Sequence, residues 1–145
     1  MVLQNITIDL DGDDIDLKEF PSSLNNYVSL KGIDDDGKCF SISLVPSRSH
    51  SVYYNEEYEN WFVDIIEENF TILKKIGVKE ISLFYNLLFS DQCNIEIFDR
   101  QILKKLAKYD IAIPFSCYYR NENELISYLL KSGYSINEIN ELNEK

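Results

Sequence analysis

Residues 55–89 read NEEYENWFVDIIEENFTILKKIGVKEISLFYNLLF, and this stretch decides the fold. Its first part has an acidic first turn, a lysine-rich last turn and apolar side chains at helical spacing: Tyr58, Trp61, Phe62, Ile65, Ile72, Leu73 and Ile76. Asn55 can cap this helix, and Gly77 is placed to end it. The stretch therefore predicts a long helix that leads directly into a strand over residues 79–89.

Upstream of this unit the sequence predicts three strands. Ile6, Ile8 and Leu10 alternate with Thr7 and Asp9, which is typical of a half-buried strand. Residues 27–30 and 39–45 are expected to form a hairpin, because the connection between them ends in Asp36-Gly37, a pair that tight turns favour. In its second strand, Phe40, Ile42 and Leu44 should face one way and the serines the other. A short helix is expected within residues 16–26, ended or kinked by Pro21.

Downstream, a short strand is expected over residues 94–98, and Asp99 can then cap a second helix. Residues 111–119 alternate as another strand. Pro114 lies within it and cannot donate a ladder hydrogen bond, which indicates an edge position or a bulge. Two short helices follow, the last with the capping-box spacing Ser135-Ile-Asn-Glu138.

One short motif occurs twice. Residues 72–76 read ILKKI and residues 102–106 read ILKKL, each time before a predicted strand. Two helix-then-strand units stacked against one sheet would explain this, although lysines collect at the C-termini of helices in general. We expect one α+β domain over residues 1–145: a mainly antiparallel sheet, helices packed on one face, and a C-terminal helical extension over about 121–145. At this length roughly 68–70% of the unfolded chain's surface can be buried.

Composition indicates the cellular compartment in which the protein is expected. No apolar run of about 18 residues is present, and residues 1–5 do not resemble a secretory signal, so no membrane association is expected. The cysteines, at positions 39, 93 and 117, are odd in number and widely spaced, which fits neither a disulfide framework nor a zinc site. All three lie in strand-like sequence, where we expect them to be buried, and a reducing cytoplasm fits best.

Charge is distributed very unevenly along the chain. Residues 1–72 hold 15 Asp or Glu against 4 Lys or Arg, whereas residues 73–145 hold 10 of each. The first half therefore carries the whole net charge of −11, much of it in two runs at residues 9–16 and 34–36. A field of one sign steers oppositely charged partners and repels nucleic acid. We therefore expect a basic protein partner and no nucleic acid.

No motif in the chain supports catalysis or metal binding. Residues 9–16 only partly match a calcium loop, because Gly12 comes too early and Phe20 stands where the twelfth-position glutamate should be. His50 lies among serines without a third orienting group, and Arg48 with those serines could at most hold a phosphate. We expect no enzyme activity, no metal and no cofactor.

The residues expected to bind the partner combine the two acidic runs with the segment that precedes the long helix. Tyrosine often anchors protein interfaces, and Tyr53 and Tyr54 lie in the predicted loop beside acidic residues. The full set is Asp11, Asp13, Asp14, Asp34, Asp35, Asp36, Tyr53, Tyr54, Glu56 and Glu57.

Part of the chain resembles a known family. The resemblance rests on Gln92-Cys-Asn-Ile-Glu-Ile97, on Asp99 opening a helix with Leu103 and Leu106, and on the strand from Ile111 to Ser116-Cys-Tyr118. This pattern resembles a family of small bacterial domains of unknown function, whose members carry a Gly-Gln-Cys-Asn-like strand, a short helix and an Ile-Ser-Cys-Tyr-like strand. Ser90-Asp91 stands where that family has its glycine, and the pattern covers less than half of the chain.

The resemblance implies a function, because such domains often accompany polymorphic or contact-dependent toxins and many serve as immunity proteins. The expectation is an immunity protein that neutralises a cognate toxin domain, such as a basic nuclease, by electrostatic and steric blocking. A non-catalytic ligand-binding or regulatory domain is the main alternative, and an enzyme using Asp, Glu or His50 is the third.

Overall fold

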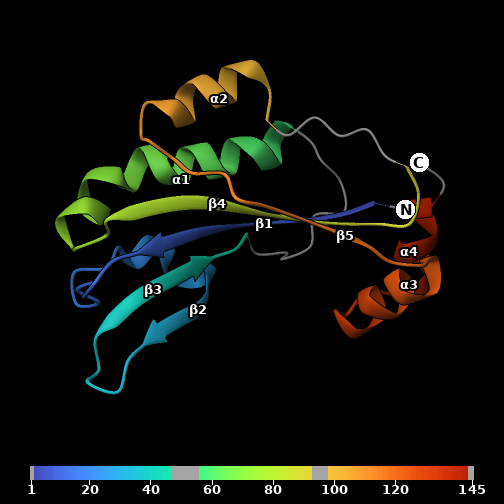
Figure 1. The fold of residues 1–145 in the computed structure, drawn as a ribbon, viewed down its shortest axis with the longest axis horizontal. Helices are drawn as coiled ribbons and strands as arrows, with labels where there is room; N and C mark the ends of the chain where they lie inside the picture. Colours follow the sequence, from blue (N-terminus) through green and yellow to red (C-terminus); the bar gives the residue numbers. More distant parts are fainter. Residues whose placement is uncertain (1, 47–55, 93–97, 144–145) are drawn as a thin grey trace.

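A computed structural model describes residues 2–46, 56–92 and 98–143 of the chain. The strands in these residues are β1 (Val2–Asp11), β2 (Val28–Ile33), β3 (Cys39–Leu44), β4 (Glu80–Phe89) and β5 (Phe115–Tyr119). The helices are α1 (Glu56–Lys75), α2 (Arg100–Ala107), α3 (Glu122–Lys131), α4 (Ile136–Asn143) and a 3-10 helix, η1 (Ser22–Tyr27). Figure 1 shows these elements arranged as one α+β domain.

The strands form one sheet in the order β2-β3-β1-β4-β5. β1 pairs with β3 and β4, and β2 pairs with β3, all antiparallel, whereas β4 and β5 are parallel. The mainly antiparallel sheet is therefore confirmed. The parallel pair arises because β4 reaches β5 through α2, so the two repeated helix-then-strand units do lie side by side, with α1 in contact with α2.

The core lies on one face of the sheet, beneath α1. Alternate residues of the two central strands are buried there: Ile6, Ile8 and Leu10 of β1, and Ile81, Leu83, Tyr85 and Leu87 of β4. Both α1 and α2 cover this face (Figure 1). The period of two along β1 and β4 therefore separates a buried face from one that carries polar residues.

The predicted stripe on α1 is correct only in part. Phe62 and Leu73 are buried as expected, but Ile72 is 36% exposed, and Val63 and Ile66 pack into the core instead. Because the sheet is twisted, different sides of this 20-residue helix face the sheet at different points along the helix. A single stripe of apolar positions taken from the sequence does not include this change. Gly77 ends this connection in a left-handed conformation (φ +104°), as expected.

Phe40 does not lie with Ile42 and Leu44. It is 47% exposed, whereas Cys39, Ile42 and Leu44 are buried. The β2–β3 pairing shifts register between Gly32 and Ile33, so β3 carries an extra residue there and Phe40 turns to the opposite face. The hairpin itself and its turn at Gly37 (φ +82°) are confirmed.

Local signals placed several boundaries correctly. The Asp99 side chain accepts hydrogen bonds from the N–H groups of Gln101 and Ile102, and Ser135 forms its capping box with Glu138. Pro21, by contrast, precedes η1 and does not end it. Asn55, Cys93 and most of the strand expected at 94–98 lie outside the described residues, and Phe98 is part of a bend, not of a strand.

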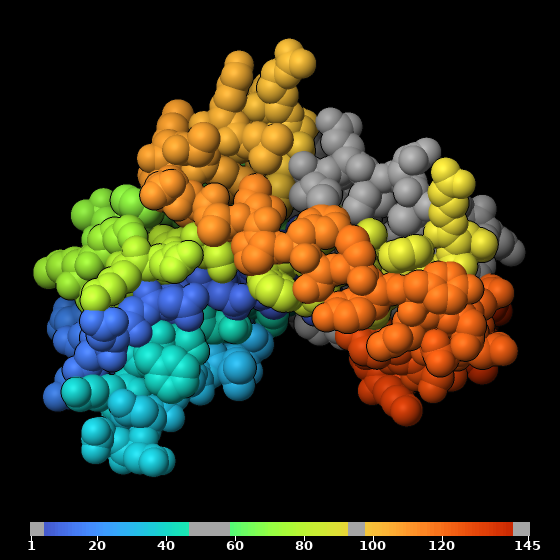
Figure 2. Space-filling view, viewed as in Figure 1, coloured from blue at the N-terminus to red at the C-terminus, as the bar shows by residue number. Residues whose placement is uncertain are grey.

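The C-terminal helices α3 and α4 form a small second core. Leu125, Leu129 and Ile139 are buried in it, and Leu88 of β4 packs against them. Leu88 alternates with the buried positions of β4, so this pair covers the end of the sheet face opposite α1. In Figure 2 the α3–α4 pair and the β2–β3 hairpin project to the same side of the molecule, with a notch between them.

β5 is an edge strand, as Pro114 indicated, but it begins at Phe115, so the strand expected from residue 111 is shorter and Pro114 precedes it. Its Cys117 is exposed, so the expectation that the cysteines are buried is confirmed for Cys39 and wrong for Cys117. Among the described residues, no helix has the length and apolar content needed to cross a membrane.

Candidate functional site

The two aspartate runs meet at one end of the sheet. The first run continues from β1 into the following segment, and the second forms the β2–β3 turn. They are held together by two backbone hydrogen bonds, from the Gly12 N–H to the Phe40 carbonyl (2.9 Å) and from the Ile15 N–H to the Cys39 carbonyl (2.7 Å). We call the aspartates brought together here the acidic end: Asp11, Asp13, Asp14, Asp16, Asp34, Asp35 and Asp36.

The segment after β1 is fixed by close backbone contact with the end of α1. A Cβ atom on Gly12 would lie 2.3 Å from the carbonyl oxygen of Gly77, far closer than real Cβ contacts allow. The Asp16 N–H donates to the Ile76 carbonyl at 2.8 Å, and the Lys79 N–H donates to the Asp11 carbonyl at 2.8 Å. The first run therefore has a defined path and is not a loose tail.

The second run builds its own turn. The Asp34 side chain accepts hydrogen bonds from the N–H groups of Asp36 (3.1 Å) and Lys38 (2.8 Å), which is an Asx-type arrangement. The Gly37 N–H donates to the Asp34 carbonyl at 3.0 Å. Asp34 thus has a structural role in addition, while all three aspartates are exposed and present their charge to solvent.

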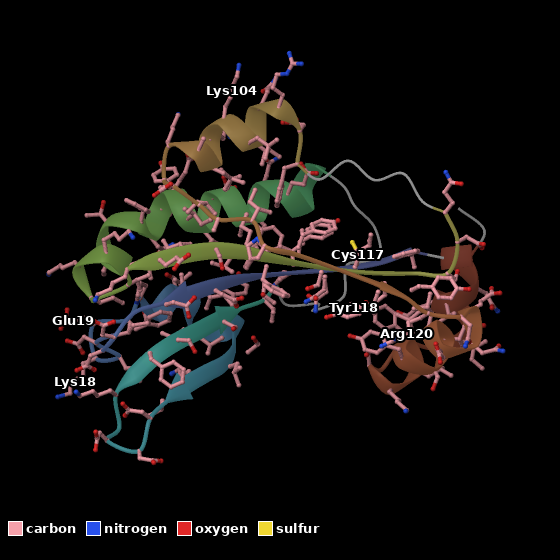
Figure 3. The ribbon with its side chains drawn as sticks, viewed as in Figure 1. Lys18, Glu19, Lys104, Cys117, Tyr118 and Arg120 are labelled. Carbon is pink, nitrogen blue, oxygen red and sulfur yellow. The ribbon has the colours of Figure 1, made fainter. Side chains whose placement is uncertain are left out.

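A small cleft lies between the two runs. It has a volume of about 400 Å³ and is lined by Asp14, Asp16 and Lys18 on one side and by Gly37 and Cys39 on the other, with Ile15 and Leu17 completing it. Figure 3 labels Lys18 and Glu19 at this end of the molecule. Among the described residues, no group of three or more His, Cys, Asp or Glu is placed to hold a metal ion.

Cations do not neutralise the acidic end. Within the described ranges, the one ion pair found here joins Asp13 to Lys79, and both side chains are mostly exposed. Exposed pairs of this kind contribute little, typically about 0–1 kcal/mol. Seven aspartates share this end with a smaller number of lysines, including Lys18, Lys38 and Lys79, so its net charge stays negative.

Two further carboxylates extend the acidic end along the open face of the sheet. β1 and β4 place Asp11 opposite Glu80, and Asp9 lies two residues away on the same face. Asp9 accepts a hydrogen bond from the Ser43 hydroxyl at 2.7 Å. Burial, then the nearby Asp9 and Glu80, raise the pKa of the Asp11 carboxyl above its ordinary value of 3.8.

Because this pKa is raised, Asp11→Asn should increase the stability of the protein by an amount that depends on pH. Because the folded chain holds the Asp11 proton to higher pH than the unfolded chain, stability falls as pH rises from about 4 through the raised pKa. We expect D11N to be more stable than the parent at pH 7, by less than about 1 kcal/mol because the site is solvated, and equally stable near pH 3. Urea denaturation at both pH values measures this. Asp91→Asn, at an exposed position away from the cluster, makes the same change in net charge and serves as the matched control.

The remaining predicted partner residues do not join this cluster. Glu56 and Glu57 begin α1, whose opposite end at Lys75 leads to the acidic end, so they lie about 30 Å away at 1.5 Å per residue. Tyr53 and Tyr54 lie outside the described residues, as do Arg48 and His50. The structure therefore brings together Asp11, Asp13, Asp14, Asp34, Asp35 and Asp36 and leaves the two glutamates apart.

Sequence reasoning missed Asp9, Asp16 and Glu80 as members of this surface. The two aspartates belong to the first run and could have been included on that ground. Glu80 joins them only through the β1–β4 register, which no local pattern reveals. The exposed Lys104 of α2 lies elsewhere, directed away from the sheet at the top of Figure 3.

The arrangement presents a fixed negative surface with a shallow cleft. Such a surface is complementary in charge to a basic protein surface. In comparisons with known proteins, no family model, no curated protein and no solved structure matches this chain.

Proposed function

We propose that this protein is an immunity protein, which binds a cognate bacterial toxin domain in the cytoplasm and blocks it. The observation that carries the proposal is the union of two separate aspartate runs into the acidic end, next to backbone contacts that fix its shape. The two runs lie at least 18 residues apart in sequence. If they served only to keep the protein soluble, they could lie anywhere on its surface. Placed together, they form one docking site.

The chemistry of the acidic end selects the kind of partner. Six exposed aspartates and the half-buried Asp11 favour a surface rich in lysine and arginine, such as the active-site region of a nuclease toxin. Binding there would cover the toxin's substrate-binding groove and compete with its phosphate contacts. The inhibitor forms and breaks no covalent bond in this proposal.

Growth rescue tests the function. The C-terminal domain of a toxin encoded beside this chain's gene should arrest growth when expressed alone, and co-expression with this chain should restore growth and yield a stable complex. A toxic neighbour that this chain neither binds nor neutralises would contradict the proposal.

Charge removal tests the docking site. The triple variant Asp34→Asn, Asp35→Asn, Asp36→Asn keeps the side-chain oxygen that the Asp34 turn requires, so it should fold normally. We expect its association rate with the toxin domain to fall about tenfold or more at low salt, because steering depends on charge, and to approach the parent's rate at high salt. Stopped-flow kinetics over a range of salt concentrations measures this.

A matched control removes three charges elsewhere. Asp91→Asn, Asp110→Asn, Glu122→Gln alters exposed residues outside the acidic end and gives the same net charge. Its association rate should change by less than threefold. Equal slowing in both triple variants would mean that net charge alone, and not the acidic end, governs encounter.

A further inference from the structure

β5 presents an unprotected strand edge. The N–H groups of β4 residue Tyr85 and of Arg120 bond across the β4–β5 pair, to the Pro114 and Phe89 carbonyls respectively, both at 2.9 Å. Because backbone groups alternate in direction along a strand, those of Phe115, Cys117 and Tyr119 point away from β4. Within the described part of the chain, the Tyr119 carbonyl accepts a hydrogen bond only from the guanidinium of its neighbour, at 3.4 Å from Arg120 Nη1. The orange residues of β5 lie uncovered on the visible surface in Figure 2.

The side chains of β5 are unusually apolar for an exposed edge. Phe115, Tyr118 and Tyr119 are 43%, 48% and 64% exposed, and the strand holds no charged residue. Natural edges are normally protected by lysines, prolines or bulges. The other edge of the sheet follows that rule, since β2 contains Lys31 and two register shifts, whereas the five residues of β5 do not.

The strand is also self-complementary. Phe115-Ser-Cys-Tyr-Tyr119 has an aromatic residue at each outward-bonding end and Cys117 at its centre. An antiparallel copy centred on Cys117 would pair Phe115 with Tyr119 of the second copy at both ends, and aromatic cross-strand pairs of this type stabilise sheets. Figure 3 shows Cys117 and Tyr118 on opposite sides of the β5 ribbon, as this alternation requires.

The charge distribution permits this contact between two acidic molecules. Cys117 lies beside Leu87, and Asp11 lies opposite Glu80, seven residues farther along β4. At about 3.3 Å per residue the acidic end is roughly 23 Å from the centre of β5 along the strand. This exceeds the screening length of about 8 Å at physiological salt, and residues 73–145, which supply β5, carry no net charge.

We infer that the chain forms a two-fold symmetric dimer in which β5 pairs with β5 of a second copy. The two sheets then join edge to edge, with Cys117 near the symmetry axis and the two acidic ends directed away from each other. The inference is independent of the proposed toxin partner, and its test uses this chain alone.

Sedimentation equilibrium of the full chain tests the dimer. The mass should rise with concentration to twice 17.0 kDa. Cys117→Pro removes an N–H that points away from β4, so the monomer should keep its fold while pairing is lost. Cys117→Ser keeps the N–H and should remain dimeric. Tyr119→Lys places a charge at the edge and should also give monomers, whereas Leu130→Lys, on the exposed side of α3, should not.

Cross-linking tests the register. In an antiparallel hydrogen-bonded pair the Cα atoms lie about 5.5 Å apart, within the range of a disulfide. With Cys93 replaced by serine, mild oxidation should link two chains through Cys117 quickly. Moving the thiol to the exposed position 127 (Cys117→Ser, Ser127→Cys) should slow this reaction at least tenfold.

A chain that stays monomeric at all concentrations overturns the inference. So does a dimer that survives both Cys117→Pro and Tyr119→Lys, because the contact must then lie elsewhere. If the chain is monomeric and these two variants weaken binding only to another protein, the edge serves that partner and not a second copy.

Discussion

Replacing Leu83 by alanine should lower the free energy of unfolding by about 3–5 kcal/mol. Leu83 is fully buried in β4, opposite Ile8 of β1, and its N–H donates to the Ala112 carbonyl at 2.8 Å. The flanking strands and α1 cannot collapse into the space that the side chain leaves. The loss therefore includes both the free energy of transferring the removed atoms to water and the cost of the cavity that remains. Because domains of this size are stable by about 5–15 kcal/mol, a large part of the total is lost. Urea denaturation followed by circular dichroism measures the loss.

Leu103→Ala makes the same chemical change on the exposed side of α2, where Leu103 is 41% exposed. It should lower the free energy of unfolding by less than about 1 kcal/mol, because the side chain is already partly exposed and alanine is a better helix former than leucine. Similar losses in the two variants would mean that β4 is not the centre of the core.

Gly12→Ala should cost about 3 kcal/mol, at the upper end of overpacking effects, and it should also disturb the acidic end. The added Cβ would lie 2.3 Å from the Gly77 carbonyl oxygen, which is backbone and cannot rotate away. Relief requires the segment after β1 to move off the end of α1, weakening the 2.8 Å hydrogen bond from Asp16 to Ile76. Hydrogen exchange should show faster exchange at the Asp16 and Lys79 amides, together with a lower urea midpoint.

The control is Gly37→Asn, within the same acidic end. Gly37 has φ +82°, which asparagine tolerates better than other non-glycine residues, and a Cβ atom added there would meet no atom of the described residues within 4 Å. This variant should lose less than about 1 kcal/mol and keep normal exchange at Asp16. If Gly12→Ala behaves in the same way, the contact between Gly12 and Gly77 is not tight.

The parts of this fold that sequence predicts are those decided by neighbouring residues. The turn at Gly37, the cap at Asp99 and the path from α1 into β4 depend on side chains within a few positions of each other. The outward turn of Phe40 could not be predicted, because it depends on a register shift against β2. The same holds for the packing of α3 and α4 on Leu88, which depends on where β4 ends relative to β5.

The candidate site, too, could be predicted from the sequence only in part. The aspartates of both runs are evident in the sequence, but their meeting depends on antiparallel pairing of β1 with β3, which places the end of one strand beside the start of the other. Grouping Glu56 and Glu57 with them overlooked the length of α1, which places those residues at the opposite end of the helix from the acidic end.

The acidic end lies at one extremity of the molecule, whereas the lysines of α2 lie on another side. Such a separation of charge gives the protein a permanent dipole moment. If the proposed basic partner approached, its field would exert a torque on that dipole before any contact, and the torque would turn the β2–β3 turn toward the partner. Orientation during approach then shortens the rotational search, so that a larger share of collisions leads to a complex.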